Sequence, residues 1–155
     1  LVIINNEVLG FSKRKIPTML DYNTHVNKKS MFNTPPVFSV YVSMLNLRWL
    51  KKNGGVSWAE AKNLEKSKLL YDCIDSNQLF TGTVKKEDRS VMNATFKLNE
   101  TKLEDKFNLM LKENGINGLK GHRSVGGYRA SMYNAMGLDS INILIEIMNN
   151  LEKKA

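Results

Sequence analysis

Residues 92–98 read Met-Asn-Ala-Thr-Phe-Lys-Leu, and in this stretch every second residue is apolar. Strict alternation predicts a β-strand that buries one face and leaves the other in water. The spacing of apolar residues becomes helical over residues 101–115, which open with the capping box Thr101–Glu104 and close at Asn114-Gly115. A strand followed directly by an amphipathic helix predicts an α/β fold.

Two short strands and one more helix are expected downstream. The strands are predicted at residues 116–119 and 128–131, on either side of a glycine-rich basic loop. The last helix carries an apolar stripe made of Ile141, Leu144, Ile145, Met148 and Leu151. This order of elements predicts a small C-terminal α/β sandwich over residues 78–155, with helices packed on one face of a sheet.

Two helices are predicted upstream, over residues 36–77. The first is expected to begin at Thr34-Pro35-Pro36, where Thr34 supplies an N-cap hydroxyl, and to end at Asn53-Gly54-Gly55. Its apolar residues cover a broad face, so it is expected to be buried. The second is expected to open with the capping box Ser57–Glu60 and to fade at residues 75–77. Its long polar face predicts an exposed connector.

The first 35 residues show little regular pattern. Residues 1–5, Leu-Val-Ile-Ile-Asn, are rich in β-branched side chains and predict a fully buried strand. The chain opens on this run without a methionine, so we expect it to be cut inside a larger sheet, although a processed terminus would look the same. Residues 11–34 have no sustained period, which predicts a long irregular segment, and such loops are often functional.

The composition excludes several classes of protein. A chain of 155 residues with 42% hydrophobic residues can bury one core. Its first apolar run is too short to predict a signal peptide, and it lacks the ~20 apolar residues in a row that a membrane span needs. The single cysteine, Cys73, excludes an internal disulfide and a cysteine-cluster metal site, and fits a reducing cytoplasm. No metal site is predicted.

The net charge of +8 makes nucleic acid a candidate partner, so the positions of the charged residues in the chain matter. Eight basic residues precede Asn53, against only Glu7 and Asp21. Loop lysines without interleaved exposed aromatic residues are more typical of a solvated surface than of a nucleic-acid groove. The distribution therefore favours a bound anion over nucleic acid.

Two segments could bind such an anion. Asn33-Thr34 precedes a predicted helix, whose unpaired N–H groups attract phosphate or carboxylate, although an ordinary helix cap has the same sequence. In the loop 118–129, glycines alternate with Lys120, His122 and Arg123, which predicts an anion clamp or else a basic hairpin with glycines at its turns. The P-loop spacing is absent, and a hydrolase reading lacks a nucleophile motif.

Taken together, Ser-Met-Phe-Asn-Thr-Pro-Pro at 30–36 and Gly-Leu-Lys-Gly-His-Arg-Ser-Val-Gly-Gly at 118–127 resemble the phosphoserine aminotransferases. Residues 16–22, 92–93 and 129–135 also match that family's pattern, so the resemblance covers nearly the whole chain. It implies a fold type I enzyme that uses pyridoxal 5'-phosphate (PLP), with a large cofactor domain followed by a small α/β domain. It also implies a cytoplasmic homodimer whose active site lies between the subunits.

The resemblance further implies a reaction and residue roles. The reaction interconverts 3-phosphohydroxypyruvate plus glutamate with phosphoserine plus 2-oxoglutarate, in serine biosynthesis. Asn33 and Thr34 would reach the cofactor phosphate of the partner subunit, and His122 and Arg123 would bind the anionic end of the substrate. Residues 1–35 would then be the end of the large cofactor domain and an irregular active-site segment, and residues 36–77 two connecting helices.

One element of the family pattern is missing. The Schiff-base lysine of these enzymes lies in an Ala-Gln-Lys-Asn motif, which this sequence does not contain, and Lys120 matches the Gly-His-Arg motif instead. Without that lysine the cofactor has no covalent anchor. The chain is therefore expected to be a C-terminal portion with no catalytic residue of its own, inactive alone. The alternative is a non-enzymatic anion- or nucleic-acid-binding α/β module.

Overall fold

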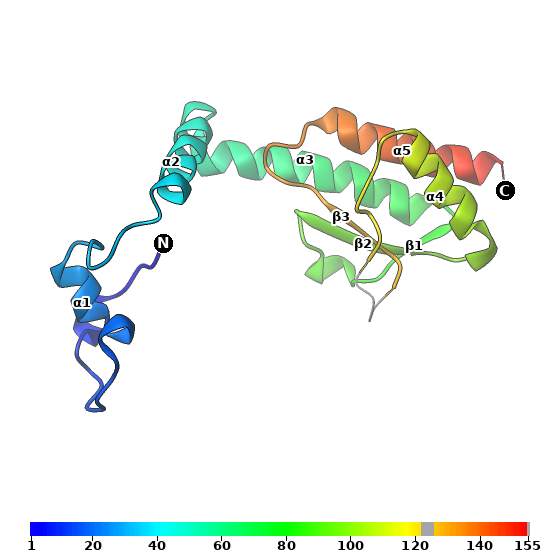
Figure 1. The fold of residues 1–155 in the computed structure, drawn as a ribbon. Helices are drawn as coiled ribbons and strands as arrows, with labels where there is room; N and C mark the ends of the chain where they lie inside the picture. The colour runs from blue at the N-terminus through cyan, green and yellow to red at the C-terminus, as the bar shows by residue number, and fades with distance from the viewer. Residues whose placement is uncertain (122–125, 155) are drawn as a thin grey trace. The chain divides into compact units, whose positions relative to one another are not determined.

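The computed structural model describes residues 1–121 and 126–154, and the chain forms two compact units, Leu1–Trp49 and Leu50–Ala155 (Figure 1). Unit 1 contains two short 3-10 helices, η1 (Asn6–Val8) and η2 (Thr18–Leu20), and a helix of two turns, α1 (Tyr22–Asn27). The strand expected at residues 1–5 is not formed. Leu1 and Ile3 are exposed, because no described segment supplies the neighbouring strand that such a run needs.

The segment 11–34 is more regular than its sequence suggests. Asp21 caps α1, and its Oδ1 accepts a hydrogen bond from the Asn23 N–H at 3.0 Å. The residues after α1 turn sharply, with positive φ at Lys29 and Ser30. The expectation of a wholly irregular segment is therefore wrong, because a capping aspartate is enough to begin a short helix without an apolar stripe.

Helix α2 (Val37–Lys52) forms where the prolines predict a helix, although two details differ. The Pro36 carbonyl accepts the Val40 N–H at 3.1 Å, so the cap position belongs to Pro36 and the prediction for Thr34 is wrong. No residue of α2 is buried, and Val37, Phe38 and Leu47 are more than half exposed. The expected burial is therefore absent from the described chain, because periodicity shows that a face needs a partner without supplying one.

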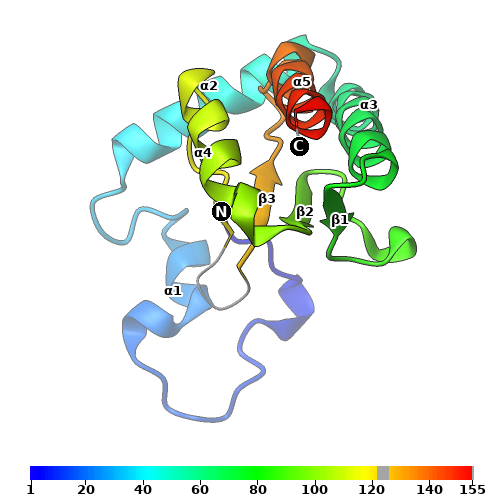
Figure 2. The same ribbon diagram turned by 90° about the vertical axis from the view of Figure 1, so that its right-hand side faces the viewer.

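Unit 2 is built on a three-stranded antiparallel sheet with the order β1-β2-β3. The strands are β1 (Phe80–Gly82), β2 (Asn93–Leu98) and β3 (Tyr128–Ser131), and a 3-10 turn, η3 (Lys86–Asp88), lies between the first two. The helices α3 (Gly55–Ser76), α4 (Glu104–Glu113) and α5 (Leu138–Lys153) all pack on one face of the sheet (Figure 2). The predicted α/β sandwich is confirmed.

The alternation in residues 92–98 places Ala94, Phe96 and Leu98 in the core, as predicted. Phe96 stacks on Tyr128 of β3 at 5.5 Å between ring centroids, and Tyr128 meets Phe107 of α4 edge-on at 5.0 Å. Phe80 of β1 completes this group, 5.1 Å from Phe107. The aromatic cluster therefore joins all three strands to α4. The apolar stripe of α5 packs against the same core.

The capping boxes of unit 2 are not formed. Helix α3 begins at Gly55, after a left-handed Gly54 (φ 111°), so Ser57 lies inside the helix. Thr101 belongs to a 3-10 turn, η4 (Thr101–Leu103), and the residue before α4, Leu103, makes no side-chain cap. Glycine and a preceding 3-10 turn begin these helices without a capping hydroxyl, since both allow the chain to enter the first turn directly.

Helix α3 is not the exposed connector that its polar residues predict. Its buried positions, which recur every three or four residues, are Ala59, Asn63, Lys66, Ser67, Leu70, Cys73 and Ile74. The stripe packs on α5 and on the first two strands. The prediction failed because three members of the stripe are polar, so the buried face is easily taken for a solvated one.

The connection between β1 and β2 is held by a bidentate ion pair. Arg89 donates from both terminal nitrogens to the Asp75 carboxylate, at 2.9 and 2.7 Å, and its guanidinium lies 4.5 Å from the Tyr71 ring centroid. Hydrogen bonds from Arg89 lower the pKa of Asp75 to about 2, from an ordinary value of 3.8. The pair ties residues 83–92 to the C-terminal end of α3.

This ion pair makes the free energy of unfolding depend on pH. Because the pKa of Asp75 is lower in the folded state, its contribution is complete above about pH 4 and is lost as the pH falls towards 2. We expect Asp75→Asn to cost about 1 kcal/mol near neutral pH and to differ little from wild type near pH 2. Urea unfolding across this range measures the difference. Asp72→Asn, in a more exposed pair with Lys68, is the control, and a cost for Asp75→Asn that does not vary with pH would contradict the assignment.

Candidate functional site

The segment Asn33-Thr34 is exposed at the N-terminus of α2. Neither side chain makes a hydrogen bond within the described residues. The N–H groups of the first helical turn have no partner four residues back, and only that of Val37 has a local acceptor, the Pro35 carbonyl at 2.8 Å. The two remaining backbone N–H groups of this turn, together with the amide of Asn33 and the hydroxyl of Thr34, form a set of donors that suits a phosphate group.

The second predicted segment falls only partly within the described residues. His122 and Arg123 lie outside them, as do Ser124 and Val125. The stems of this loop are described and form the neck of a hairpin: the Gly121 N–H donates to the Gly127 carbonyl at 2.8 Å, and Arg129 N–H to the Leu119 carbonyl at 2.7 Å. The strand predicted at 116–119 is not formed, and the pairing with β3 here is an isolated bridge between the next residue, Lys120, and Tyr128.

Two glycines of the loop are required by close backbone approach. A Cβ on Gly121 would collide with the Gly126 carbonyl oxygen, and one on Gly127 would lie 2.7 Å from the Phe96 carbonyl oxygen. Gly127 also has a φ of +64°, which L-residues rarely adopt. The described neck before β3 therefore fits only glycine at residues 121 and 127.

The neck is expected to tolerate no side chain at residue 127. Gly127→Ala adds a backbone collision to the strain of a positive φ, whereas Gly118→Ala at φ +75° meets no atom within 4 Å. We expect Gly127→Ala to lower the free energy of unfolding by about 1–3 kcal/mol more than Gly118→Ala does. Chemical denaturation of both variants measures this difference, and equal losses would show that the contact with Phe96 costs nothing.

The face of the sheet opposite the helices is polar and carries unpaired cations. Arg129 of β3 pairs with Thr95 of β2 in register, and Lys97 of β2 pairs with Thr81 of β1. Both basic side chains are exposed, and neither joins an ion pair with another described residue. The sheet therefore adds positive charge next to the loop 121–127, which favours an anionic ligand there.

The two predicted segments belong to different units. Asn33 and Thr34 lie in unit 1, and the neck of the loop lies in unit 2.

A polar cluster inside unit 2 was missed by the sequence prediction. Lys66 of α3 is 1% exposed, and its Nζ donates to the carbonyl oxygens of Tyr133 at 2.7 Å and Met136 at 3.2 Å, with Met132 at 3.5 Å. Asn63, one turn earlier, donates to Asn134 Oδ1 at 2.8 Å. The signal for both residues was their spacing on the apolar stripe, because Lys66 lies four residues before Leu70 and seven before Cys73, and Asn63 lies seven before Leu70.

Burying this polar cluster costs folding free energy. Burial lowers the pKa of Lys66, and no carboxylate among the described residues pairs with its ammonium group. Asn63 Oδ1 is buried without a hydrogen-bond partner, which costs about 1–3 kcal/mol. Both groups lie where an apolar residue would pack at lower cost.

Among residues 1–121 and 126–154, no group of three or more histidine, cysteine, aspartate or glutamate side chains is placed to hold a metal ion. Within the same residues, no helix is both long enough and apolar enough to cross a membrane.

The sequence is similar to known enzymes over nearly its full length. It is 54% identical over 154 residues to the phosphoserine aminotransferase of Flavobacterium psychrophilum, and 49% identical over 156 residues to that of Parabacteroides distasonis. Each alignment covers 99% of this chain, but only 43% and 44% of the relatives. The chain therefore spans less than half the length of the curated relatives that it matches.

Solved structures agree. A phosphoserine aminotransferase studied for radiation damage of its Schiff base superposes with a TM-score of 0.89 at 43% identity, covering 96% of this chain and 42% of that one. The enzyme from Bacillus circulans subsp. alkalophilus gives 0.85 at 41% identity, over 90% of this chain and 39% of that one. The family model for class-V aminotransferases matches residues 7–144. The chain belongs to the class-V aminotransferase family.

Proposed function

We propose that this chain is the C-terminal portion of a phosphoserine aminotransferase, which interconverts 3-phosphohydroxypyruvate plus glutamate with phosphoserine plus 2-oxoglutarate. The observation that carries the proposal is the match to enzymes of that name along 99% of the chain, at 54% identity for the Flavobacterium psychrophilum protein. The hairpin neck and the cations beside it support it, because both substrate pairs contain dianions.

The cofactor of the complete enzyme is PLP, which is the ligand named for the related protein of Trichomonas vaginalis. When bound, PLP acts as an electron sink for the amino-acid carbon. Asn33 and Thr34 hold its phosphate across a subunit boundary. Their free side chains and the unpaired N–H groups at the start of α2 suit this task, because a helix N-terminus favours a phosphate dianion.

The substrate's anionic end is bound by His122 and Arg123. An arginine fork matches the phosphate of phosphoserine as well as the side-chain carboxylate of glutamate, so one loop serves both half-reactions. His122 adds a hydrogen-bond donor whose charge depends on pH. The close-packed neck at Gly121 and Gly127 fixes where this loop begins and ends on the sheet.

The complete enzyme is a homodimer that shares its active sites between subunits. The exposed apolar face of α2 supports this, since contiguous apolar surface marks a protein interface. The residues that form this face are Val37, Phe38, Val40, Tyr41, Leu45 and Leu47. The dimer works in the cytoplasm, where the buried free thiol of Cys73 stays reduced.

The intact mass of the purified protein and its absorbance spectrum test the proposal together. A polypeptide heavier than 17.6 kDa, or one with a co-purifying N-terminal piece, should show the visible absorbance of bound PLP and transaminase activity with phosphoserine. A protein of 17.6 kDa should show neither by itself. A longer protein with bound PLP that does not act on phosphoserine would refute the proposed substrate.

A further inference from the structure

The turn between β3 and α5 directs three of its carbonyl oxygens at one point, which the ammonium group of Lys66 occupies. Lys66 Nζ lies 2.7 Å from the Tyr133 carbonyl oxygen, 3.2 Å from that of Met136 and 3.5 Å from that of Met132. Lys66 is 1% exposed, so these oxygens take the place of its water shell. Carbonyl oxygens that replace a water shell in this way are also the ligands by which potassium channels hold a bare ion.

The turn keeps this geometry through contacts that do not involve the lysine. Met132 and Ile141 are 1% and 2% exposed, and Met136 packs against the same core. The Met132 N–H donates to the Met92 carbonyl at 2.7 Å, and the Met136 N–H donates to the Tyr133 carbonyl at 2.9 Å. We therefore expect the three carbonyl oxygens to stay in place when the lysine side chain is shortened.

A fourth oxygen atom at this turn has no partner. Asn63, one turn before Lys66 on α3, donates to Asn134 Oδ1 at 2.8 Å, whereas its own Oδ1 is buried without a hydrogen-bond partner among the described residues. An ammonium group has only three N–H donors, and three carbonyl oxygens already face them. A spherical ion has no fixed bond directions, so it can take a further oxygen ligand from Asn63.

The oxygens around this point favour a monovalent cation over a divalent one. They are neutral carbonyl and amide oxygens, whereas calcium and magnesium sites are built with carboxylates. Among the residues that the structure describes, no group of three acidic, histidine or cysteine side chains is placed to hold a metal ion. A cage that fits an ammonium group at hydrogen-bond distance suits the ammonium and potassium ions better than the smaller sodium ion.

We propose that the turn at residues 132–136 is a monovalent-cation site, and that the ammonium group of Lys66 is the cation built into it. A buried lysine costs more than an apolar residue of similar volume, and the cage of carbonyl oxygens accounts for its presence, because those oxygens need a positive charge among them. When the side chain is truncated, a free potassium or ammonium ion takes its place. The inference does not depend on the reaction of the complete enzyme.

The test measures the thermal stability of the complete protein with Lys66→Ala, which empties the site, in chloride salts of equal ionic strength. We expect potassium or ammonium to raise the Tm of this variant by about 2–4 °C relative to choline, because a ligand that binds only the folded state stabilises it. Lys66→Met fills the same space with an apolar chain and should show no difference between salts. The wild type should show none either, because its site is full.

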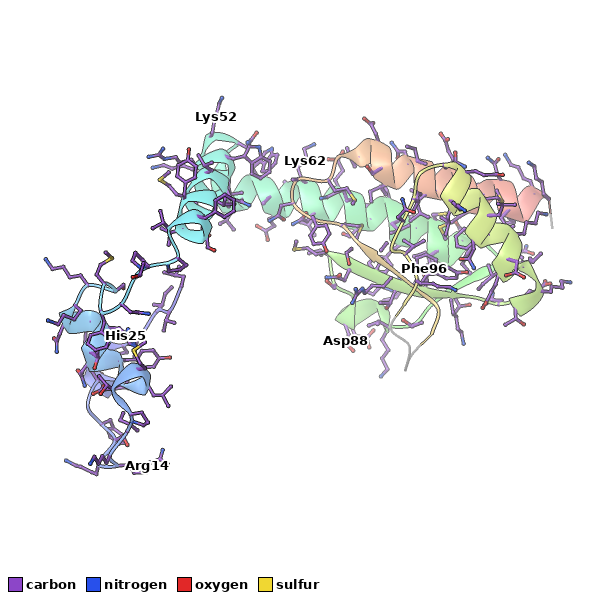
Figure 3. The ribbon with its side chains drawn as sticks, viewed as in Figure 1. Arg14, His25, Lys52, Lys62, Asp88 and Phe96 are labelled. Atoms are coloured by element: carbon purple, nitrogen blue, oxygen red, sulfur yellow. The ribbon has the colours of Figure 1, made fainter. Side chains whose placement is uncertain are left out.

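Lys62→Ala controls for the loss of a lysine from α3. Lys62 lies one turn earlier on the same helix, is half exposed and paired with Glu65, and is labelled in Figure 3. Its Tm should not depend on which cation is present. Crystals of the Lys66→Ala protein in rubidium chloride give a direct readout, since rubidium scatters anomalously. We expect an anomalous peak among the carbonyl oxygens of the turn, and a site that holds only water would overturn the inference.

The remaining outcomes also decide the question. A Tm of Lys66→Ala that sodium raises as much as potassium, or that is the same in every salt, would show that the turn selects no cation. A variant that folds in none of the salts would likewise overturn the inference, since an ion in the cage should restore the fold. A response to potassium that Lys66→Met shares would place the ion elsewhere in the protein.

Discussion

Arg123→Ala should raise the KM of the complete enzyme for phosphoserine about 100-fold without unfolding the protein. Loss of one partner from a buried, hydrogen-bonded charge pair costs about 2–5 kcal/mol, and each 1.4 kcal/mol is a factor of ten. The effect should be largest for the phosphorylated substrate, because the side-chain carboxylate of glutamate carries less charge. Steady-state kinetics with each amino donor measures both values.

Lys112→Ala is the control for the loss of one positive charge. Lys112 is exposed on α4, in the same unit, and should leave the KM unchanged. If the Arg123 variant keeps the wild-type KM for phosphoserine, then this arginine does not bind the phosphate. A melting temperature equal to that of wild type would show that the kinetic loss is not a loss of fold.

Phe96→Ala should lower the free energy of unfolding of unit 2 by about 3–5 kcal/mol. The Phe96 ring, labelled in Figure 3, is 0% exposed and lies between Phe80 at 5.8 Å and Tyr128 at 5.5 Å. The cavity would open where all three strands meet α4, so rigid neighbours on every side limit collapse. Denaturant unfolding followed by circular dichroism gives the difference.

Lys97→Ala is the matched control, because it lies next in the same strand on the exposed face. Its cost should stay within about 0.5 kcal/mol. A cost below about 1.5 kcal/mol for Phe96→Ala would mean that the aromatic cluster relaxes into the space, and that the sheet is less rigidly packed than the ring geometry indicates.

The elements predicted best from the sequence are those whose packing partners lie in the core of unit 2. β2, α4 and α5 each bury one face in the same small core, so their periodicity alone determines both their type and their orientation. β1 was missed because its three residues, Phe-Thr-Gly, are too few to show an alternation. The strand predicted at residues 1–5 and the burial of α2 failed for another reason: an apolar pattern shows that cover is needed, but not where it comes from.

The residues of the candidate site also differ in whether the sequence alone identifies them. Asn33, Thr34, His122 and Arg123 were identified by residue type and motif, and their roles stay predictions. Lys66 and Asn63 could not be identified by type, because a lysine on a helix is usually solvated. Only their place in the stripe that contains Leu70 marked them as buried, and their carbonyl acceptors come from a turn 66–71 residues away in sequence.

The aromatic cluster has a consequence for spectroscopy. Its rings are phenylalanine and tyrosine only, whereas the two tryptophans of the chain are Trp49, the last residue of unit 1, and Trp58, in the first turn of α3. Indole fluorescence therefore reports on α2 and the start of α3, and not on the sheet core. The tyrosine dichroism in the near ultraviolet includes that of Tyr128 in the sheet core, so a melt followed by both signals would test whether the two units unfold in one transition or in two.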